Sequence, residues 1–372
     1  MGEKVLQSRL SELLALADIE VNGNRPWDIQ IHNEKFYRRV LTQGELGLGE
    51  SYMDGWWDCA ELDGFIYRVL KAQLHEKVTS RAAALESMKA KLCNLQRGIR
   101  AFKVGEHHYD IGNDLFERML DNRMIYSCGY WKEARTLDQA QENKLDLICR
   151  KLRLEPGMRV LDVGCGWGGT AKFVSERYKV QVTGVTVSRE QTRLAKETCR
   201  DLPVQIYLKD YRDIDGKYDR IFSIGMFEHV GKKNYRTFMR TMKDLLKEDG
   251  LFLLHTIGAN RATYTIGAWT SRYIFPNSHV PAAAEVTDAM EGSFILEDWQ
   301  NFGADYDRTL MSWYDNFEKN WPDLKERYDQ RFYRMWRYFL LSCAGSFRAR
   351  WRQLWQVVLS PKGIPGVYHA PR

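Results

Sequence analysis

Several features of secreted, metal-binding and membrane-spanning proteins are missing from this 372-residue sequence. Its seven cysteines include no C-x-x-C pair, which argues against a disulfide framework and against a structural zinc site, so we expect no metal. No apolar run approaches the ~20 residues that a membrane span needs, and no signal-peptide pattern opens the chain. We therefore expect a cytoplasmic globular protein, long enough for two domains.

Acidic residues are absent from residues 331–372, which contain eight Lys and Arg. Residues 1–90, in contrast, contain 14 acidic and 11 basic residues. A localised basic surface suits an anionic partner, such as a lipid bilayer, a nucleic acid or a phosphorylated substrate. Arg331, Arg334 and Arg337 share a helical face and alternate with aromatic residues. That pattern is equally typical of a membrane-docking helix and of a helix that covers a core.

A glycine-rich stretch at 159–169, R-V-L-D-V-G-C-G-W-G-G, predicts an apolar strand, a tight turn and the start of a helix. Its spacing also fits a dinucleotide-binding turn, with glycines at Gly164, Gly166 and Gly169. However, the next apolar strand ends in Thr186 instead of an acid that would bind a ribose, and Asp162 stands just before the glycines. An acid in that place resembles the layout of S-adenosylmethionine-dependent methyltransferases.

The rest of the chain alternates between strand and helix periodicity, which predicts an α/β fold with a parallel sheet. We expect strands at 159–163, 180–185, 203–208, 218–224, 250–257 and 354–359, and helices at 138–152, 170–178, 188–200 and 234–247. Before them we expect an amphipathic helix from Leu6 to Ala17, a short strand at 28–32, a glycine- and aromatic-rich structural turn at 44–57, and helices at 63–78 and 80–96. Aromatic-rich helices after residue 260 should cover the crevice at the carboxyl ends of the strands.

Five further strings carry a resemblance to a known family: G-E-L-G-L-G-E-S-Y-M-D-G-W-W at 44–57, Y-S-C-G-Y-W at 126–131, M-F-E-H-V-G at 226–231, L-L-H-T-I-G at 253–258 and G-A-D-Y-D at 303–307. Together with the glycine-rich stretch they resemble the bacterial cyclopropane-fatty-acyl-phospholipid synthases, over nearly the whole chain. Mycolic acid cyclopropane synthases look similar in the catalytic half but typically lack the N-terminal domain.

The resemblance implies a class I S-adenosylmethionine-dependent methyltransferase, with a Rossmann-like sheet and a small helical N-terminal domain. It implies a lipid-handling and dimerisation domain at 1–90, a linker at 91–104 and a catalytic domain at 105–372. It further implies that the enzyme adds a methylene unit to the cis double bond of an unsaturated phospholipid acyl chain. The expected partners are a phospholipid bilayer, met at the inner face of the cytoplasmic membrane, and a second copy in a homodimer, with no nucleic acid.

The resemblance also implies the site residues. A bound bicarbonate, the family's base, would contact Glu228, His255, Tyr306 and the backbone N–H groups of Cys128 and Ile257. We expect burial beside that anion to raise the pKa of Glu228. S-adenosylmethionine would contact the glycine-rich stretch and the segments after neighbouring strands, through Tyr126, Ser127, Asp162, Gly164, Gly166, Trp167, Thr186, Val187, Gln191, Asp210 and Tyr211.

Other functions stay open on the sequence. Close relatives of such an enzyme can produce a methyl-branched chain or methylate a small amine, and an inactive lipid-binding module would keep the same fold. A nucleic-acid methyltransferase would need a base-binding motif such as N-P-P-[YFW] after strand 218–224, where Gly225, Met226, Phe227 and Glu228 stand instead. A nicotinamide-dependent enzyme would need the missing ribose-binding acid.

Overall fold

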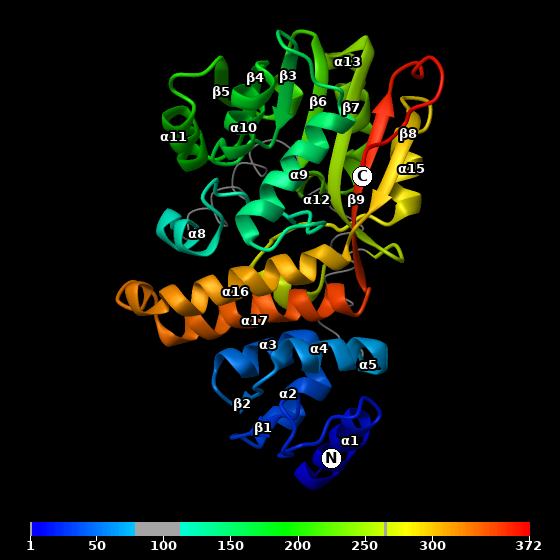
Figure 1. Ribbon diagram of the computed structural model, residues 1–372. Helices are drawn as coiled ribbons and strands as arrows, with labels where there is room; N and C mark the ends of the chain where they lie inside the picture. The colour runs from blue at the N-terminus through cyan, green and yellow to red at the C-terminus, as the bar shows by residue number, and fades with distance from the viewer. Residues whose placement is uncertain (1, 79–111, 264–265) are drawn as a thin grey trace. The chain divides into compact units, whose positions relative to one another are not determined.

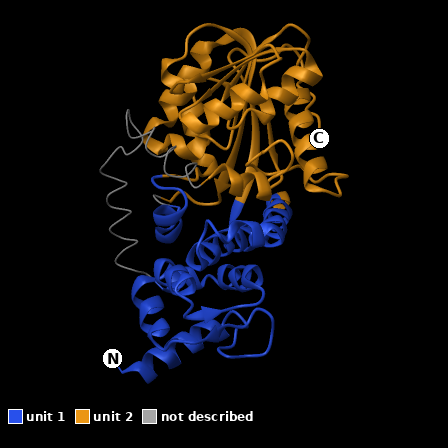
Figure 2. Cartoon of the chain, turned by 90° about the vertical axis from the view of Figure 1, so that its left-hand side faces the viewer, with its two compact units in different colours: residues 1–93, 264–277, 306–352 blue, residues 94–263, 278–305, 353–372 orange. Residues whose placement is uncertain are grey.

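The computed structural model describes residues 2–78, 112–263 and 266–372, drawn in colour in Figure 1. The chain forms two compact units (Figure 2), one made of residues 1–93, 264–277 and 306–352, the other of residues 94–263, 278–305 and 353–372. The predicted helix at 80–96 and linker at 91–104 lie outside the described residues. The predicted functional division into 1–90 and 105–372 stays a prediction, since each compact unit combines segments that are far apart in the sequence.

The second unit is built on a seven-stranded sheet with the order β5-β4-β3-β6-β7-β9-β8. The five strands β3 to β7 pair in parallel with one another, and β8 is antiparallel to β9. The strands are β3 Arg159–Val163, β4 Gln181–Thr186, β5 Val204–Leu208, β6 Tyr218–Ile224, β7 Leu246–Ala259, β8 Ile295–Asn301 and β9 Arg352–Ser360. The predicted α/β fold is confirmed. The strand order reverses between β3 and β6, which is where ligands bind in open parallel sheets.

Helices cover both faces of this sheet, as side-chain alternation in the strands requires. On one face, Val160 and Leu253 pack with residues of α9 and α10. On the other, Leu161 and Phe252 pack with α13 and α15. The helices of this unit are α8 Asn113–Met119, α9 Leu137–Lys151, α10 Gly169–Tyr178, α11 Arg189–Thr198, α12 Phe227–Val230, α13 Tyr235–Leu245 and α15 Ala283–Met290, with 3-10 turns η1 Tyr211–Asp213 and η2 Lys232–Asn234.

The first unit is helical, with one two-stranded ribbon. Its elements are α1 Glu3–Ala15, β1 Gln30–Ile31, α2 Lys35–Gln43, α3 Glu45–Met53, β2 Trp57–Asp58, α4 Leu62–Lys71, α5 Leu74–Lys77, α14 Ala268–Tyr273, α16 Ala304–Leu324 and α17 Gln330–Arg348. The single helix expected at 63–78 is broken, because Gln73 takes the left-handed conformation between α4 and α5. α16 and α17 belong to this unit almost entirely, since only the first two residues of α16 fall in the second unit.

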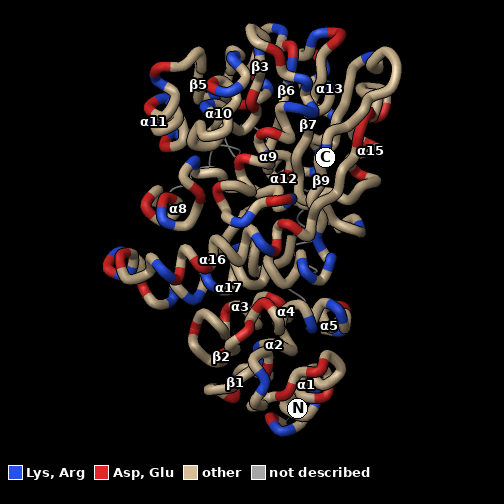
Figure 3. Tube along the Cα trace, in the orientation of Figure 1, with Lys and Arg blue, Asp and Glu red and all other residues tan. Residues whose placement is uncertain are grey.

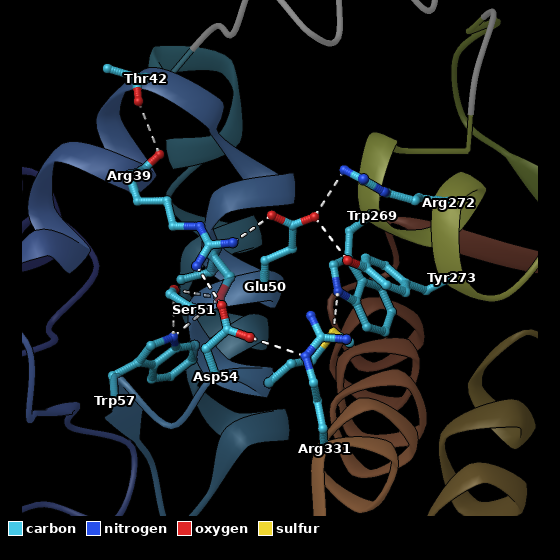
Figure 4. A network of polar contacts seen from close by, with 12 residues as sticks. Arg39, Thr42, Glu50, Ser51, Asp54, Trp57, Trp269, Arg272, Tyr273 and Arg331 are labelled. Atoms are coloured by element: carbon cyan, nitrogen blue, oxygen red, sulfur yellow. Dashed lines mark hydrogen bonds and ion pairs between the residues drawn. The ribbon is translucent and has the colours of Figure 1, made fainter.

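The glycine-rich segment at 44–57 is a helix, α3, and not the structural turn that we expected. A Cβ at Gly47 would lie 2.4 Å from the backbone oxygen of Arg39, and one at Gly49 would lie 2.3 Å from the ring of Trp269. Its glycines therefore serve close helix packing. Glu50 on the same helix accepts hydrogen bonds from Arg39 at 2.6 Å, and from Arg272 and Tyr273 at 3.0 and 2.9 Å (Figure 4).

The arginines of α17 have acidic and tyrosine partners inside the first unit. Arg331 pairs with Asp54, Arg334 with Asp58, and Arg348 with Asp63 and Asp307. The guanidinium of Arg337 donates to the hydroxyls of Tyr52 and Tyr314. Lys, Arg, Asp and Glu are accordingly interspersed along the trace (Figure 3). These contacts favour the interpretation of α17 as a helix that covers a core. Within the described residues, no helix is long and apolar enough to cross a bilayer.

Candidate active site

The turn between β3 and α10 has backbone angles that only glycine adopts readily. Gly164, Gly166 and Gly168 have φ of 92°, 53° and 86°. A Cβ at Gly169 would lie 2.0 Å from the backbone oxygen of Arg123, so the helix start packs directly on another segment. Among the described residues, no atom would lie within 4 Å of a Cβ at Gly166. The turn thus combines a fixed backbone with open space beside Gly166, which suits a ligand that lies against the main chain.

Aromatic rings stand beside this turn. Trp167 donates through its indole N–H to Asn113 Oδ1 at 3.1 Å, and its ring packs on Phe116 at a centroid distance of 4.9 Å. The ring of Tyr126 contacts the same phenylalanine at 5.2 Å. The structure therefore brings two of the predicted cofactor residues, Tyr126 and Trp167, around one side chain of α8.

The segment after β4 is held by side-chain hydrogen bonds. Thr186 Oγ1 donates to Gln191 Oε1 at 2.7 Å, and the hydroxyl of Ser188 accepts from the backbone N–H of Gln191 at the start of α11. Val187 between them is half-buried. The three predicted residues of this segment, Thr186, Val187 and Gln191, thus form one ordered corner.

The segment after β5 is also ordered by its own contacts. The carboxylate of Asp210 accepts from Arg212 at 2.6 Å and 2.8 Å, and caps the turn η1. Tyr211 packs edge-on against Phe238 at 5.1 Å, and burial raises its pKa to about 12. These contacts fix Asp210 and Tyr211 at the carboxyl end of β5, next to the end of β4.

Glu228 lies in α12, shortly after β6, and His255 lies within β7, beside Ile224 at the end of β6. Both are almost completely buried, at 5% and 1% exposure. Glu228 Oε1 accepts from the backbone N–H of Ile257 at 2.6 Å. Its other oxygen, Oε2, and His255 Nε2 are buried with no hydrogen-bond partner in the described part of the chain. Because buried polar atoms are nearly always satisfied, two such atoms at neighbouring strand ends point to a polar ligand.

The electrostatics of these two groups follow from burial. Burial raises the pKa of Glu228 to about 7, although the amide of Ile257 opposes the shift. This is the expected direction, produced here by burial alone. Burial, helped by the charges of Lys144 and Lys151, holds the pKa of His255 well below its usual range. Near neutral pH the imidazole is therefore uncharged, and Glu228 can exist in either protonation state.

The remaining predicted residues are placed as follows. Cys128 is fully buried in the segment that runs along α9, where a Cβ on the neighbouring Gly129 would contact Ala140. Tyr306 lies in α16 of the first unit, where its ring packs on Trp313 and Phe347. The structure thus brings Glu228, His255 and Ile257 together within the second unit, and places Tyr306 in the other unit.

Three buried polar residues near this site were missed from the sequence. Gln356 on β9 lies 3.4 Å from His255 Nδ1, through its amide nitrogen. Gln141 and Lys144 lie on the buried face of α9 and contact the segment that contains Ser127. A signal existed for the last two, since a glutamine and a lysine three residues apart interrupt the apolar face of a predicted amphipathic helix.

Comparison with known proteins shows which family the chain belongs to. The family model described as Mycolic acid cyclopropane synthetase matches residues 96–357. Over 356 residues the chain is 52% identical to the cyclopropane-fatty-acyl-phospholipid synthase of Escherichia coli K12, covering 94% of this chain and 92% of that protein. The chain belongs to the cyclopropane synthase family. It is accordingly an enzyme of the S-adenosylmethionine-dependent methyltransferase type.

Solved structures agree with this membership of the cyclopropane synthase family. The cyclopropane synthase MmaA2 of Mycobacterium tuberculosis has a TM-score of 0.66 at 30% identity, covering 69% of this chain and 97% of that chain. The mycolic acid cyclopropane synthase CmaA1, solved with S-adenosylhomocysteine and CTAB, has a TM-score of 0.65 at 30% identity and the same coverage. The predicted methyltransferase sheet is therefore confirmed.

Proposed function

We propose that this enzyme transfers a methylene unit from S-adenosylmethionine to the cis double bond of an unsaturated acyl chain in a membrane phospholipid. The products are a cyclopropane acyl chain and S-adenosylhomocysteine. The observation that carries the proposal is the 52% identity to the Escherichia coli synthase over 94% of the chain. The matching N-terminal segment sets this chain apart from relatives that match only two thirds of it.

The residues of the second unit fit the cofactor. S-adenosylmethionine supplies, when bound, an electrophilic methyl group on a sulfonium. The open space beside Gly166 allows close approach to the main chain, and the ordered corner at Thr186 and Gln191 stands at the next strand end. Trp167 and Tyr126 add aromatic surface at the same edge. These residues bind and orient the donor, which is what a weak alkene nucleophile requires.

Aromatic and apolar side chains around His255 support the next step, in which methyl transfer leaves a carbocation on the acyl chain. The ring of Phe302 packs edge-on against His255 at 5.8 Å and against Tyr130 at 5.3 Å. Such rings exclude water, which would quench the cation, and their faces attract positive charge.

Ring closure then needs a base, and Glu228 and His255 fit the proposed bicarbonate. Bicarbonate supplies, when bound, a base that removes a proton from the transferred methyl group. The neutral imidazole donates one hydrogen bond through one ring nitrogen, and ionised Glu228 accepts from a hydroxyl through Oε2. Ile257 donates its backbone N–H to Glu228 at 2.6 Å, so binding of the anion at this amide involves an exchange of partner. Tyr306 and Cys128 complete the proposed set.

Residues 1–90 are proposed to handle the lipid and to form the homodimer, at the inner surface of the cytoplasmic membrane. What supports this part is the match of 94% of the chain to the Escherichia coli cyclopropane-fatty-acyl-phospholipid synthase. Because the arginines of α17 are engaged in internal ion pairs, the proposal places no weight on them as a membrane contact.

The test is a reaction of purified protein, bicarbonate, methyl-deuterated S-adenosylmethionine and vesicles of a cis-unsaturated phospholipid, followed by mass spectrometry of the acyl chains. We expect chains that gain one carbon and two of the three deuterons, because one is lost when the ring closes. Retention of all three would support the alternative of a methyl-branched product. Methylation of a small amine with no change in the lipid would refute the proposed lipid substrate. A parallel reaction without bicarbonate tests only the proposed base.

A further inference from the structure

Lys144 is a fully buried lysine that the proposed chemistry leaves without a role. The residue has no exposed surface, and its Nζ donates a hydrogen bond of 2.9 Å to Ser127 Oγ. Lysine is almost never fully buried unless it is paired, because removing an ammonium from water costs several kcal/mol. Packing alone therefore does not explain why the ammonium group of Lys144 is buried beside Ser127.

The helix that contains Lys144 holds the segment 125–130 through several contacts. Gln141, one turn earlier on α9, donates to the backbone oxygen of Ser127 at 2.8 Å and to that of Ile125 at 3.4 Å. The backbone N–H of Tyr130 donates to the backbone oxygen of Ala140 at 2.8 Å. These contacts fix the backbone of the segment without Lys144, whose hydrogen bond goes to the side chain of Ser127. The lysine thus acts on the hydroxyl itself.

The direction of that hydrogen bond determines what Ser127 can do. An ammonium can only donate, so the serine oxygen accepts and its hydrogen points elsewhere. In the described part of the chain, that hydrogen has no acceptor. A positive charge behind the oxygen also polarises the hydroxyl and makes it a stronger donor. The pair therefore presents a donor in a locally positive surrounding, which suits an anionic oxygen.

Two carboxyl groups lie near Lys144, and the negative charge of Asp121 offsets part of the charge of the lysine. Asp121 already accepts backbone N–H groups of Ile125 and Arg123 through its two oxygens. Asp162 on β3 is 1% exposed, and burial raises its pKa to about 8 despite the charge of Lys144, so its neutral form dominates near pH 7. Burial also lowers the pKa of Lys144 to about 8, which still leaves the ammonium form in the majority at pH 7.

We propose that Lys144 is a positioning residue of the cofactor site, which directs the Ser127 hydroxyl at the carboxylate of the amino-acid end of S-adenosylmethionine. The carboxylate is the anionic group of that molecule, whereas its sulfonium and amino group are cationic and would be repelled. The inference rests on the proposed cofactor site, in which Ser127 is a contact.

The test compares two probes in bicarbonate-free buffer by calorimetry. S-adenosylhomocysteine has the amino-acid end, and 5′-methylthioadenosine lacks it. We expect Lys144→Met to weaken the binding of S-adenosylhomocysteine by about tenfold or more, because a charge-assisted hydrogen bond is lost. The affinity for methylthioadenosine should be unchanged. Lys144→Arg should restore part of the loss, and Ser127→Ala should reproduce it.

The double variant separates a positioning role from a structural one. If Lys144 acts through the hydroxyl, adding Lys144→Met to Ser127→Ala should cause little further loss of affinity for S-adenosylhomocysteine. Equal losses for both probes, or additive losses in the double variant, would overturn the inference. If Lys144→Met does not fold, the probe selectivity of Ser127→Ala and of Lys144→Arg decides instead. Failure of the wild-type protein to bind S-adenosylhomocysteine would instead refute the proposed cofactor site.

Discussion

Replacing Glu228 by glutamine should make the protein more stable at alkaline pH while it abolishes the proposed chemistry. In the folded chain, burial raises the pKa of this carboxyl to about 7, whereas its ordinary value is 4.5. Below pH 4.5 the group is protonated in both states and its ionisation contributes nothing. Between these values only the unfolded chain ionises, which favours unfolding. Above pH 7 both states are ionised, so the folded chain bears the full free-energy cost of a buried carboxylate.

The magnitude follows from the difference between the two pKa values. A shift from 4.5 to about 7 corresponds to about 3 kcal/mol in the free energy of unfolding at pH 8. Glutamine avoids this cost and keeps an oxygen that can accept from the Ile257 amide. The measurement is thermal unfolding of wild type and Glu228→Gln at pH 5 and pH 8 without cofactor. With an unfolding entropy of about 2.1 cal/mol/K per residue, we expect a rise in Tm of roughly 4 °C at pH 8 and a much smaller one at pH 5.

Glu285 provides a matched control with the opposite sign. Burial alone would raise its pKa, but hydrogen bonds from His279, Lys232 and the amide of Ala282 lower it to about 2. Glu285→Gln should therefore lower Tm at pH 8, and lower it less as the pH falls toward 2. An equal Tm change of Glu228→Gln at both pH values would refute the reasoning, as would a stabilising Glu285→Gln.

Three further predictions, two of them with a control substitution, test other parts of the structure. Gly49→Ala should lower Tm by placing a methyl group against an indole ring, at a cost of about 1–3 kcal/mol. Gly64→Ala should be neutral or stabilising, because the nearest atom to its Cβ is the end of the flexible Glu61 side chain at 3.3 Å. Gly166→Ala and Gly157→Ala both strain a residue with positive φ, but calorimetry should find weaker S-adenosylhomocysteine binding only for the first. Arg334→Met should lower Tm without changing sedimentation with anionic vesicles, and the reverse result would restore α17 as a membrane contact.

The parallel part of the fold could be predicted from the sequence because its signals are local. Each apolar strand, the turn at Gly164 and Gly166, and the capping residues of the following helices depend on neighbours in the chain. The same holds for residues near the carboxyl ends of the strands, since parallel topology brings Thr186, Glu228 and His255 toward one edge of the sheet.

What the sequence could not show depends on contacts between distant segments. Helix α3 has a glycine at position 49 because the ring of Trp269, 220 residues later, occupies the space where a side chain would lie. Nothing near residue 49 in the sequence indicates that partner. The arginines of α17 looked like a free basic surface because their acidic partners, such as Asp54 and Asp58, stand far earlier in the chain. In both cases, the partner that decides the role of the residue is unknown until the fold is known.

The buried polar groups of the second unit gather on one face of its sheet. Alternation along the strands places Asp162, His255 and Gln356 on the same side as Val160 and Leu253, which is the side that α9 covers with Lys144. On the opposite side, Leu161, Phe252 and Val357 pack with α13 in an apolar cluster. Burial of a carboxyl, an imidazole and an ammonium on one face is costly. Selection for stability alone would remove these groups, so their presence on the α9 face supports the proposed cofactor site there.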